Sequence, residues 1–351
     1  MIVLALETTC DETAAAVIND QLEVLSSVVA SQADLHEIYK GVVPEIAARA
    51  HVERILPVID ETLSKANLTI DDLDAIAVAN TPGLSGSLLV GVAAAKALCL
   101  AKSKPLVAVN HLHAHVFACQ FASESPIYPC VGLVVSGGHT HLYHYNSPTQ
   151  YRFLGGTIDD AAGEAFDKVA SMLGLPYPGG PSISKVATDG DPTAFDFPRS
   201  FLKQDKIAFS FSGLKTAVRY AITGPGKFDI DASELSAEQV SNLAASFQQA
   251  VVDCLVTKSV QAVRQSGGSK TKRLCVGGGV AANKVLREQL ATACKSNNIE
   301  LHFAKLEHCT DNAVMGAIAI ERFKAGLVED LNLDIVPGLI RNPVTSPSVK
   351  S

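Results

Sequence analysis

Short apolar runs recur along the chain, and most of them are separated by longer stretches in which apolar positions follow a helical period. The runs are rich in Val, Ile, Leu and Ala and are bounded by turn residues, which is typical of buried strands. We expect strands at residues 2–6, 14–18, 74–79, 106–109, 131–136, 140–145, 274–276 and 301–303. The helical spacing predicts helices at residues 41–63, 88–101, 238–263, 284–294 and 313–323. This order of elements predicts an α/β fold.

One local arrangement occurs twice: a strand, a turn of small or polar residues, and a second strand. It is found first around the polar turn at residues 7–13 and again around Gly137 and Gly138. An internal repeat of this kind predicts two similarly built lobes.

Composition narrows the class of protein. The length of 351 residues and the hydrophobic fraction of 47% allow two domains with a substantial core. The first apolar run meets Glu7 and Asp11 too early for a signal peptide or a membrane span, so we expect a cytoplasmic protein with no membrane partner. The 8 cysteines include no CxxC pair, which fits reduced thiols. A formal net charge of -7 argues against broad nucleic-acid affinity, so such a partner would need a local patch or a helper protein.

The segment from Asn110 to His115 predicts a metal site. If Asn110 caps a helix, His111 and His115 lie four residues apart on one face, and His113 points elsewhere. Two imidazoles in this position can hold one divalent ion, and neutral imidazole suits zinc, iron, nickel or copper. The alternative is that these histidines are packed or solvated at the edge of an apolar segment. The sequence also contains a rival cluster, which consists of His139, His141 and His144.

Turns with little or no side chain allow backbone N–H groups to approach an anion directly. The turn at residues 136–138 is of this kind, and so is the glycine-rich turn at residues 277–283. The second turn is not a P-loop, because GKS or GKT is missing, and it does not have the GxGxxG pattern of dinucleotide-binding proteins. It remains a candidate cradle for a nucleotide.

Carboxylates stand near these candidate sites. Asp11 and Glu12 lie in the first polar turn, which could face a phosphate or be an ordinary hairpin turn. Asp167 lies on an acidic predicted helix and could bind ribose hydroxyls, whereas the acidic residues could equally stabilise the start of that helix. Asp311 could be an ordinary N-cap, or a carboxylate that a closing lobe brings to the histidine pair.

Taken together, these motifs resemble the TsaD family of bacterial-type tRNA adenosine threonylcarbamoyltransferases, which were once described as glycoproteases. The resemblance covers nearly the whole chain. It rests on ETTCDET (residues 7–13), PEIAAR (44–49), TPGLSGSL (81–88), NHLHAH (110–115), SGGHT (136–140), TIDDAAGEAFDK (157–168), GGGVAAN (277–283) and TDNA (310–313).

The resemblance implies an actin-like ATPase (ASKHA) fold, in which two ribonuclease H-like lobes have the active-site cleft between them. On this fold we expect an N-terminal lobe at residues 1–110 and a second lobe, with the metal histidines and nucleotide loops, at residues 111–310. The C-terminal helix at residues 311–335 is expected to return to the N-terminal lobe, and residues 336–351 are expected to form a tail.

The resemblance also implies roles for individual residues. The metal ligands would be His111, His115 and Asp311, and they would hold one divalent metal per subunit, Fe²⁺ in the first place and Zn²⁺ as the alternative. The residues that bind the adenylate and threonyl parts of the donor would be Val134, Val135, Ser136, Gly137, Gly138, Asp167, Gly180 and Asn283. Asp11 and Glu12 are the candidates to orient or deprotonate the attacking amine.

The implied reaction transfers a threonylcarbamoyl group from threonylcarbamoyl-AMP to N6 of the adenosine next to the anticodon in tRNAs that read ANN codons, and releases AMP. An aromatic amine is a weak nucleophile, so the site must activate the carbamoyl carbon and stabilise the departing phosphate, as a metal and backbone N–H groups can. The implied partners are a TsaB-type paralogue and a TsaE-type ATPase. The acidic net charge fits an assembled complex that grips the tRNA.

Two positions depart from the family pattern. His113-Ala114 stands where many members have Glu-Gly, and Gly156 stands where a Glu is more usual. Neither position is an expected metal ligand, so the departures leave open mainly whether His113 adds to the metal site.

Three other functions compete with the transferase. A metalloprotease would need a general base beside the histidines, as in HExxH, but Leu112 follows His111. A sugar kinase or chaperone-like ATPase shares the expected fold class, and fold alone does not fix function. A non-catalytic partner or scaffold with the same hairpins is the remaining alternative.

Overall fold

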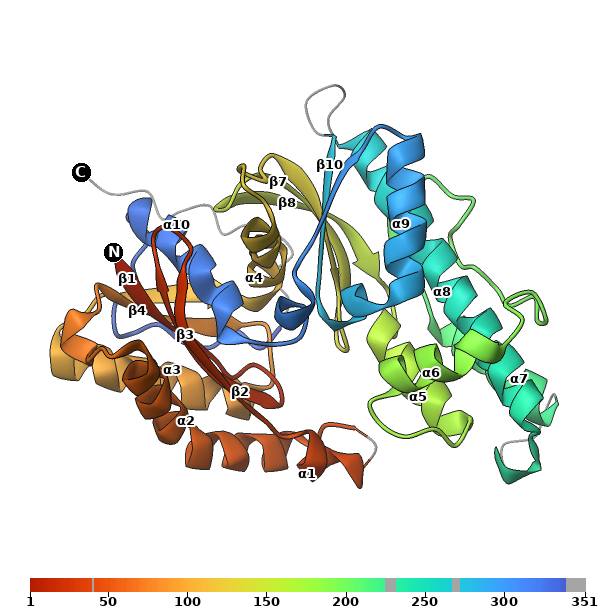
Figure 1. Ribbon diagram of the computed structural model, residues 1–351, viewed down its shortest axis with the longest axis horizontal. Coiled ribbons are helices and arrows are strands. Elements are labelled where there is room, and N and C mark those ends of the chain that lie inside the picture. Colours follow the sequence, from red (N-terminus) through yellow and green to blue (C-terminus); the bar gives the residue numbers. More distant parts are fainter. Residues whose placement is uncertain (40, 225–231, 267–271, 339–351) are drawn as a thin grey trace.

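The computed structural model describes residues 1–39, 41–224, 232–266 and 272–338. Two β-sheets lie next to each other, and each has helices packed on it (Figure 1). The N-terminal sheet and its helices lie on the left of the view, and α8 and α9 lie at the right edge.

The first sheet contains the first five strands of the chain. These are β1 (Ile2–Glu7), β2 (Glu12–Asn19), β3 (Val24–Ser31), β4 (Ala75–Thr81) and β5 (Leu106–Asn110). Their order in the sheet is β3-β2-β1-β4-β5. β1, β2 and β3 pair antiparallel, whereas β4 is parallel to β1 and β5 is parallel to β4.

The second sheet repeats this plan. Its strands are β6 (Cys130–Val135), β7 (Thr140–Ser147), β8 (Gln150–Thr157), β9 (Ala208–Phe209), β10 (Arg273–Gly277) and β11 (Glu300–Phe303). The order is β11-β10-β6-β7-β8-β9, with β6, β7 and β8 antiparallel and β10 and β11 parallel to β6. The strands β6, β7, β8, β10 and β11 have the same arrangement as β1 to β5 of the first sheet. The predicted internal repeat is therefore present, and β9 is an addition to it.

The helices are distributed over the faces of the two sheets (Figure 1). The α-helices are α1 (Ala33–Glu37), α2 (Pro44–Ala66), α3 (Ser85–Lys102), α4 (His111–Phe117), α5 (Ala162–Met172), α6 (Gly179–Val186), α7 (Ser212–Thr223), α8 (Ala237–Gln265), α9 (Lys284–Ser296) and α10 (Ile318–Lys324). The 3₁₀ helices are η1 (Ile70–Asp72), η2 (Ala118–Ala122), η3 (Ala187–Asp189), η4 (Ala232–Glu234), η5 (Gly279–Ala282), η6 (Leu306–His308) and η7 (Ala313–Ala317).

The apolar residues of β1 divide between two cores, because successive side chains of a strand point to opposite faces. Leu4 and Leu6 belong to the core that β1 shares with α2 and α3. Val3 and Ala5 belong to a larger core, which continues through α4 and η7 into the second sheet. Burial on both faces explains why β1 reads as a continuous apolar run rather than an alternating one.

The C-terminal segment packs against the first sheet. η7 contacts β1 and β2, and α10 contacts β5. The helical part ends at Lys324, so the helix expected at residues 311–335 is shorter than predicted. Beyond it, Glu329 bridges to Leu106 of β5, and the Val336 N–H donates to the Asn80 carbonyl oxygen at 2.9 Å. We propose on these contacts that the segment belongs to the N-terminal lobe; the expected tail lies outside the described residues after Gly338.

Several elements differ from the sequence-based expectations. β3, β8 and β9 were not predicted, so each expected two-stranded hairpin is part of a longer antiparallel unit. Residues 179–181 form the first turn of α6. Pro181 is compatible with this turn because the first N–H groups of a helix have no partner within it.

One helix in the described part of the chain is long and apolar enough to cross a membrane by length and composition, and this is α3. It packs against β4 and α2, with Leu88, Val92 and Ala95 buried. These contacts are those of a core helix in a soluble protein.

Candidate active site

The histidine segment forms α4, which follows directly from β5. The Asn110 side-chain oxygen accepts hydrogen bonds from the backbone N–H groups of Leu112 at 2.9 Å and His113 at 3.3 Å, so it caps the helix as predicted. The ring centroids of His111 and His115 are 4.6 Å apart. The helical spacing therefore brings these two imidazoles together.

His113 points away from this pair, as the helical spacing predicts. Its Nδ1 lies 2.7 Å from the Tyr145 hydroxyl, and its ring also packs against Tyr143 and Tyr151. Burial lowers the pKa of His113 to about 3. A neutral imidazole packed among tyrosines has a structural role here and does not join the pair.

Asp311 comes from the far end of the chain, in the segment just before η7. Asn312 caps η7, since its side-chain oxygen accepts from the Met315 N–H at 3.3 Å, so Asp311 is not an N-cap. A Cβ atom on Gly316 would meet the Ala5 Cβ at 2.8 Å, which means that η7 packs closely on β1. This close packing fixes where the Asp311 carboxylate lies.

The Asp311 carboxylate faces both histidines. Its Oδ1 lies 3.6 Å from His111 Nε2 and 3.2 Å from His115 Nε2, and one ligand atom from each residue falls within 4.8 Å of the others. Around a tetrahedral ion with bonds of 2.0–2.1 Å, neighbouring ligand atoms are about 3.3 Å apart. Both ring nitrogens of His115 are buried and make no hydrogen bond within the protein. These residues therefore fit one divalent metal ion.

The charges in this group depend on one another. Burial alone would lower the pKa of His111, but the carboxylates of Asp311 and Glu7 raise it to about 9. Burial lowers the pKa of His115, although Asp311 acts in the opposite direction. Burial would raise the pKa of Asp311, but the two imidazoles lower it well below its usual range. The carboxylates of Asp311 and Glu7 therefore favour a positive charge at the histidine pair.

Two residues that the sequence analysis did not assign to the site support His111 from β1. Glu7 ends β1, and its Oε2 lies 3.1 Å from His111 Nδ1. The Thr9 hydroxyl oxygen lies 3.1 Å from the same nitrogen. The signal that could have identified Glu7 is its place at the end of a wholly apolar strand, where a carboxylate needs a buried partner.

The rival histidine cluster does not form a three-ligand group. In the part of the chain that the structure describes, His111, His115 and Asp311 are the one set of three or more His, Cys, Asp or Glu side chains close enough to share an ion. His139 and His141 have ring centroids 5.7 Å apart. His144 lies three positions after His141 in β7, so its side chain points to the opposite face of the strand and cannot converge with His141.

Asp11 and Glu12 lie where the chain enters β2. The Ser31 hydroxyl donates a hydrogen bond of 2.9 Å to Glu12 Oε1. Burial raises the pKa of Glu12 to about 7, and the charges of Asp11 and Asp311 add to this effect. Burial also raises the pKa of Asp11, to which Asp311 again contributes. Both carboxylates therefore lie near the His-His-Asp group.

The turn between β6 and β7 presents backbone rather than side chains. Val134 and Val135 are buried in β6, so a ligand could meet them only through backbone groups. A Cβ atom on Gly137 or Gly138 would have no heavy atom within 4 Å, and both residues are exposed. The Ser136 carbonyl oxygen accepts from a backbone N–H at the start of α5 at 3.2 Å, which holds the turn against that helix.

Asp167 is held against Gly179 at the start of α6, next to Gly180. Asp167 Oδ1 accepts from the Gly179 N–H at 2.7 Å, and a Cβ atom on Gly179 would meet the Asp167 Cα at 2.5 Å. At Gly180 the corresponding space is open. Burial raises the pKa of Asp167 and of the Tyr177 hydroxyl, and Asp11 contributes to both shifts. Asp167 and Tyr177 therefore lie within electrostatic range of Asp11 in the first hairpin turn.

Asn283 connects three helices. Its side-chain oxygen accepts from the Leu286 N–H at 3.0 Å and caps α9. Its amide nitrogen donates to the Ser184 hydroxyl of α6 at 3.0 Å and to Gln248 Oε1 of α8 at 2.8 Å. These contacts engage the polar atoms of the side chain within the protein.

We expect Asn283→Ala to destabilise the fold. The variant removes a helix cap and the amide that donates to α6 and α8, a loss of about 1–3 kcal/mol. The hydrogen bond from the Ser184 hydroxyl to Gln248 Oε1 remains. Urea unfolding followed by circular dichroism would show a lower midpoint. Lys284→Ala, at an exposed neighbouring position of α9, is the matched control and should change the midpoint little. An unchanged midpoint for Asn283→Ala would contradict the assignment of these hydrogen bonds.

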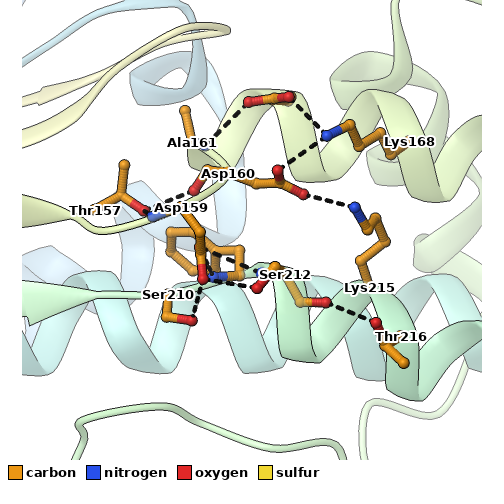
Figure 2. A network of polar contacts seen from close by, with 11 residues as sticks. Thr157, Asp159, Asp160, Ala161, Lys168, Ser210, Ser212, Lys215 and Thr216 are labelled. Carbon is orange, nitrogen blue, oxygen red and sulfur yellow. Dashed lines mark hydrogen bonds and ion pairs between the residues drawn. The ribbon is translucent and has the colours of Figure 1, made fainter.

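A polar network holds α5 in place (Figure 2). Asp159 accepts from the hydroxyl groups of Ser210 at 2.6 Å and Ser212 at 2.7 Å, which ties the turn before α5 to the start of α7. The neighbouring Asp160 forms an ion pair of 3.0 Å with Lys215 of α7. α5 carries Asp167, so this network sets the position of that carboxylate.

The unusual glycine at position 156 is explained by its neighbours. A Cβ atom on Gly156 would meet the His141 Cδ2 at 2.3 Å and the Thr140 carbonyl oxygen at 3.0 Å. The present position of the His141 ring therefore requires a residue without a side chain at 156.

A surface groove is lined by other residues of the described part of the chain. It has a volume of about 800 Å³ and runs between β3 and the 3₁₀ helices η2 and η6. None of the candidate site residues lines it.

Sequence comparisons identify relatives along nearly the whole chain. A sequence model of the TsaD family, described as tRNA N6-adenosine threonylcarbamoyltransferase, matches residues 23–318. A protein of that name from Rhodopirellula baltica is 54% identical over 348 residues, which cover 97% of each chain. Another from Syntrophobacter fumaroxidans is 51% identical over 322 residues, which cover 92% of this chain and 94% of that protein.

Solved structures with the same fold are distant in sequence. The HypF protein of T. kodakarensis aligns over 93% of this chain and 48% of its own, with a TM-score of 0.60 and 14% identity. A ROK hexokinase from Thermus thermophilus aligns over 93% of this chain and 100% of its own, with a TM-score of 0.52 and 14% identity. At this identity the likeness concerns the fold alone, and it agrees with the expected ASKHA architecture.

Proposed function

Since the chain belongs to the tRNA N6-adenosine threonylcarbamoyltransferase family, we propose that it transfers the threonylcarbamoyl group of threonylcarbamoyl-AMP to a tRNA. The acceptor is N6 of the adenosine next to the anticodon in tRNAs that read ANN codons, and AMP is released. The observation that carries the proposal is the group of His111, His115 and Asp311, in which one ligand atom from each residue lies within 4.8 Å of the others.

His111, His115 and Asp311 would hold the metal in this proposal. Two imidazoles and one carboxylate suit Fe²⁺, and Zn²⁺ accepts the same ligands. When bound, the metal would polarise the carbamoyl carbonyl group or offset negative charge on the departing phosphate. The donor set supports a divalent ion with one or more positions left for the substrate.

The donor would lie along the turn of residues 136–138 and the start of α6. The backbone N–H groups of that turn suit the phosphate, and Val134 and Val135 would contribute through the backbone. The Asp167 carboxylate suits ribose hydroxyls, and the open space at Gly180 leaves room for the adenylate. Asn283 would act mainly by holding the start of α9 against α6, because its side chain is engaged within the protein.

Asp11 and Glu12 would act on the acceptor. A carboxylate whose pKa is raised to about 7 can take a proton from the N6 amine as the new bond to the carbamoyl carbon forms. The proton then resides on Glu12, and the electron pair of the breaking bond leaves with the phosphate of AMP. Asp11 would orient the amine. The target base must leave its stack to reach this position, which a nucleotide in a loop can do.

The proposed partners are a TsaB-type paralogue and a TsaE-type ATPase, with the complex located in the cytoplasm. A net charge of -7 disfavours strong tRNA binding by this chain alone. Ile38 of the α1 region and Val52 and Leu56 of α2 are 77%, 64% and 65% exposed, which is the kind of surface a protein partner covers. Full-strength tRNA binding by the isolated chain would contradict this part of the proposal.

The proposal can be tested by supplying threonylcarbamoyl-AMP with labelled threonine to the purified chain and its TsaB-type partner. The acceptor is an ANN-decoding tRNA transcript, and the control is the same transcript with guanosine in place of the target adenosine. Label should enter the first transcript alone, with release of AMP. No transfer, with metal content and partner verified, would favour a scaffold, and sugar-dependent consumption of ATP would favour a kinase.

A further inference from the structure

We propose that Glu7 is a positioning residue that keeps the remaining imidazole proton of His111 on Nδ1, so that Nε2 can bind the metal. The inference deepens the proposed function, because it concerns the same metal site. It can be tested by metal binding alone, without reference to the transfer reaction.

The contacts of Glu7 define the direction of the hydrogen bond. Its Oε2 lies 3.1 Å from His111 Nδ1, and the residue is 3% exposed. An ionised carboxylate can only accept hydrogen bonds, so His111 Nδ1 must be the donor. The opposite ring nitrogen, Nε2, faces the Asp311 carboxylate at 3.6 Å. A metal ligand of this kind needs a lone pair on Nε2 and its proton on Nδ1.

The second oxygen of Glu7 is fixed by the backbone. Oε1 accepts a hydrogen bond of 2.7 Å from the Thr9 N–H in the turn after β1. The two carboxylate oxygens therefore have separate tasks: Oε1 holds the turn, and Oε2 meets His111. The Thr9 hydroxyl, 3.1 Å from His111 Nδ1, can donate or accept and does not set a direction.

His115 provides a contrast within the same site. Its Nδ1 makes no hydrogen bond and its Nε2 faces Asp311 at 3.2 Å, so no residue outside the proposed metal ligands orients its proton. His111 is thus the ligand that is held from the first sheet. Through Glu7, the end of β1 is connected to the metal group on α4.

The substitution Glu7→Gln separates the two tasks of the side chain. The Thr9 N–H requires an oxygen, so the amide oxygen of the new side chain takes the place of Oε1. The amide NH₂ then takes the place of Oε2 and faces His111 Nδ1 with a proton. When a metal is bound to Nε2, the proton of His111 is on Nδ1. Two hydrogen-bond donors, Nδ1–H and this NH₂, then face each other without an acceptor between them. The turn is preserved while the bound state is disfavoured.

Glu7→Ala has a different effect on the same hydrogen bond. It removes the support for Nδ1–H but adds no opposing donor, and the Thr9 hydroxyl can accept in its place. We therefore expect metal affinity to decrease in the order wild type, Glu7→Ala, Glu7→Gln. A residue with only a structural role would give the reverse order for the two variants, since glutamine is the milder replacement.

The experiment measures binding of Zn²⁺ and Co²⁺ to the full chain by competition with a chromophoric chelator. We expect about 10- to 100-fold weaker binding for Glu7→Gln. The melting temperature of the metal-free variant should stay near that of the wild type. Thr9→Val is the matched control, because it removes the other group beside Nδ1, and its affinity should stay within about threefold of wild type.

Wild-type affinity in Glu7→Gln, or weaker binding in Glu7→Ala than in Glu7→Gln, would overturn the proposal. If Glu7→Gln fails to fold, the metal affinity of Glu7→Ala tests the proposal. Weaker binding than in the wild type supports the role of Glu7, and unchanged binding contradicts it. Failure of the proposed transferase function would appear separately, as absence of label transfer by a wild-type chain that binds metal in the expected way.

Discussion

Asp311→Asn should remove the metal and lower the rate of threonylcarbamoyl transfer about 10³-fold, because a Lewis acid at this point supplies several kcal/mol and each 1.36 kcal/mol is tenfold in rate. Asparagine has nearly the same shape as aspartate but carries no charge to offset a dication. The ring centroids of His111 and His115 would remain 4.6 Å apart, because α4 holds both side chains. Elemental analysis of the purified variant and the label-transfer rate are the two measurements.

The matched control for this prediction is Glu307→Gln, in η6 of the same C-terminal segment. The Glu307 side chain is 71% exposed and lies beside His308, which is not one of the proposed metal ligands. This control should keep both its metal and its rate. Retention of one metal ion per chain by Asp311→Asn, with a rate within tenfold of wild type, would contradict the ligand set.

The repeated sheet could be foreseen because its central strands are buried on both faces. β1 and β4 are apolar up to their last one or two residues, and β6 is apolar throughout, so these strands can be recognised without their neighbours. β3 has a different character, with Ser26 the one buried residue among partly and fully exposed neighbours. It lies at the edge of its sheet and gains its conformation by pairing with β2. Its own sequence therefore carries a weak signal.

β8 was missed for a related reason. Gly155 and Gly156 interrupt it, and glycine disfavours a strand when it is judged locally. The need for glycine comes from outside the strand, because a Cβ atom at 155 would meet the Ile207 carbonyl oxygen at 1.8 Å, and one at 156 would meet His141. Such contacts with residues distant in sequence cannot be derived from the strand itself.

The candidate site also has one part that could be predicted from local sequence and one part that depends on distant contacts. The pairing of His111 and His115 follows from helix geometry alone and could be predicted from their spacing. Asp311 lies about 200 residues away, and its contact with them depends on the packing of η7 against β1. Only the family resemblance indicated that contact before the structure did. The role of Glu7 could not be predicted from the sequence either. It depends on His111, which follows β5, and β5 lies two strands away from β1 in the sheet.

Glu12→Gln should lower the transfer rate about 10²- to 10⁴-fold if Glu12 is the general base. The same assignment predicts a pH dependence. Burial raises the pKa of Glu12 to about 7, and the protonated acid cannot accept the amine proton, so the rate should fall as the pH decreases through this value. A bound dication nearby favours the carboxylate, which moves the midpoint to about pH 6 to 7. Transfer rates from pH 5 to 8.5 at saturating metal measure both effects.

Ser31→Ala provides the matched control, because it keeps the carboxylate and removes the hydrogen bond that stabilises its charged form. The midpoint of its acid limb should move to higher pH, while the rate on the alkaline plateau stays near that of wild type. Glutamine at position 12 still offers an oxygen to the Ser31 hydroxyl, so Glu12→Gln tests the proton transfer rather than the local fold. If the acid limb persists in Glu12→Gln and disappears in Asp11→Asn, the base is Asp11, and the buried carboxyl of Glu12 only shapes the entrance to β2.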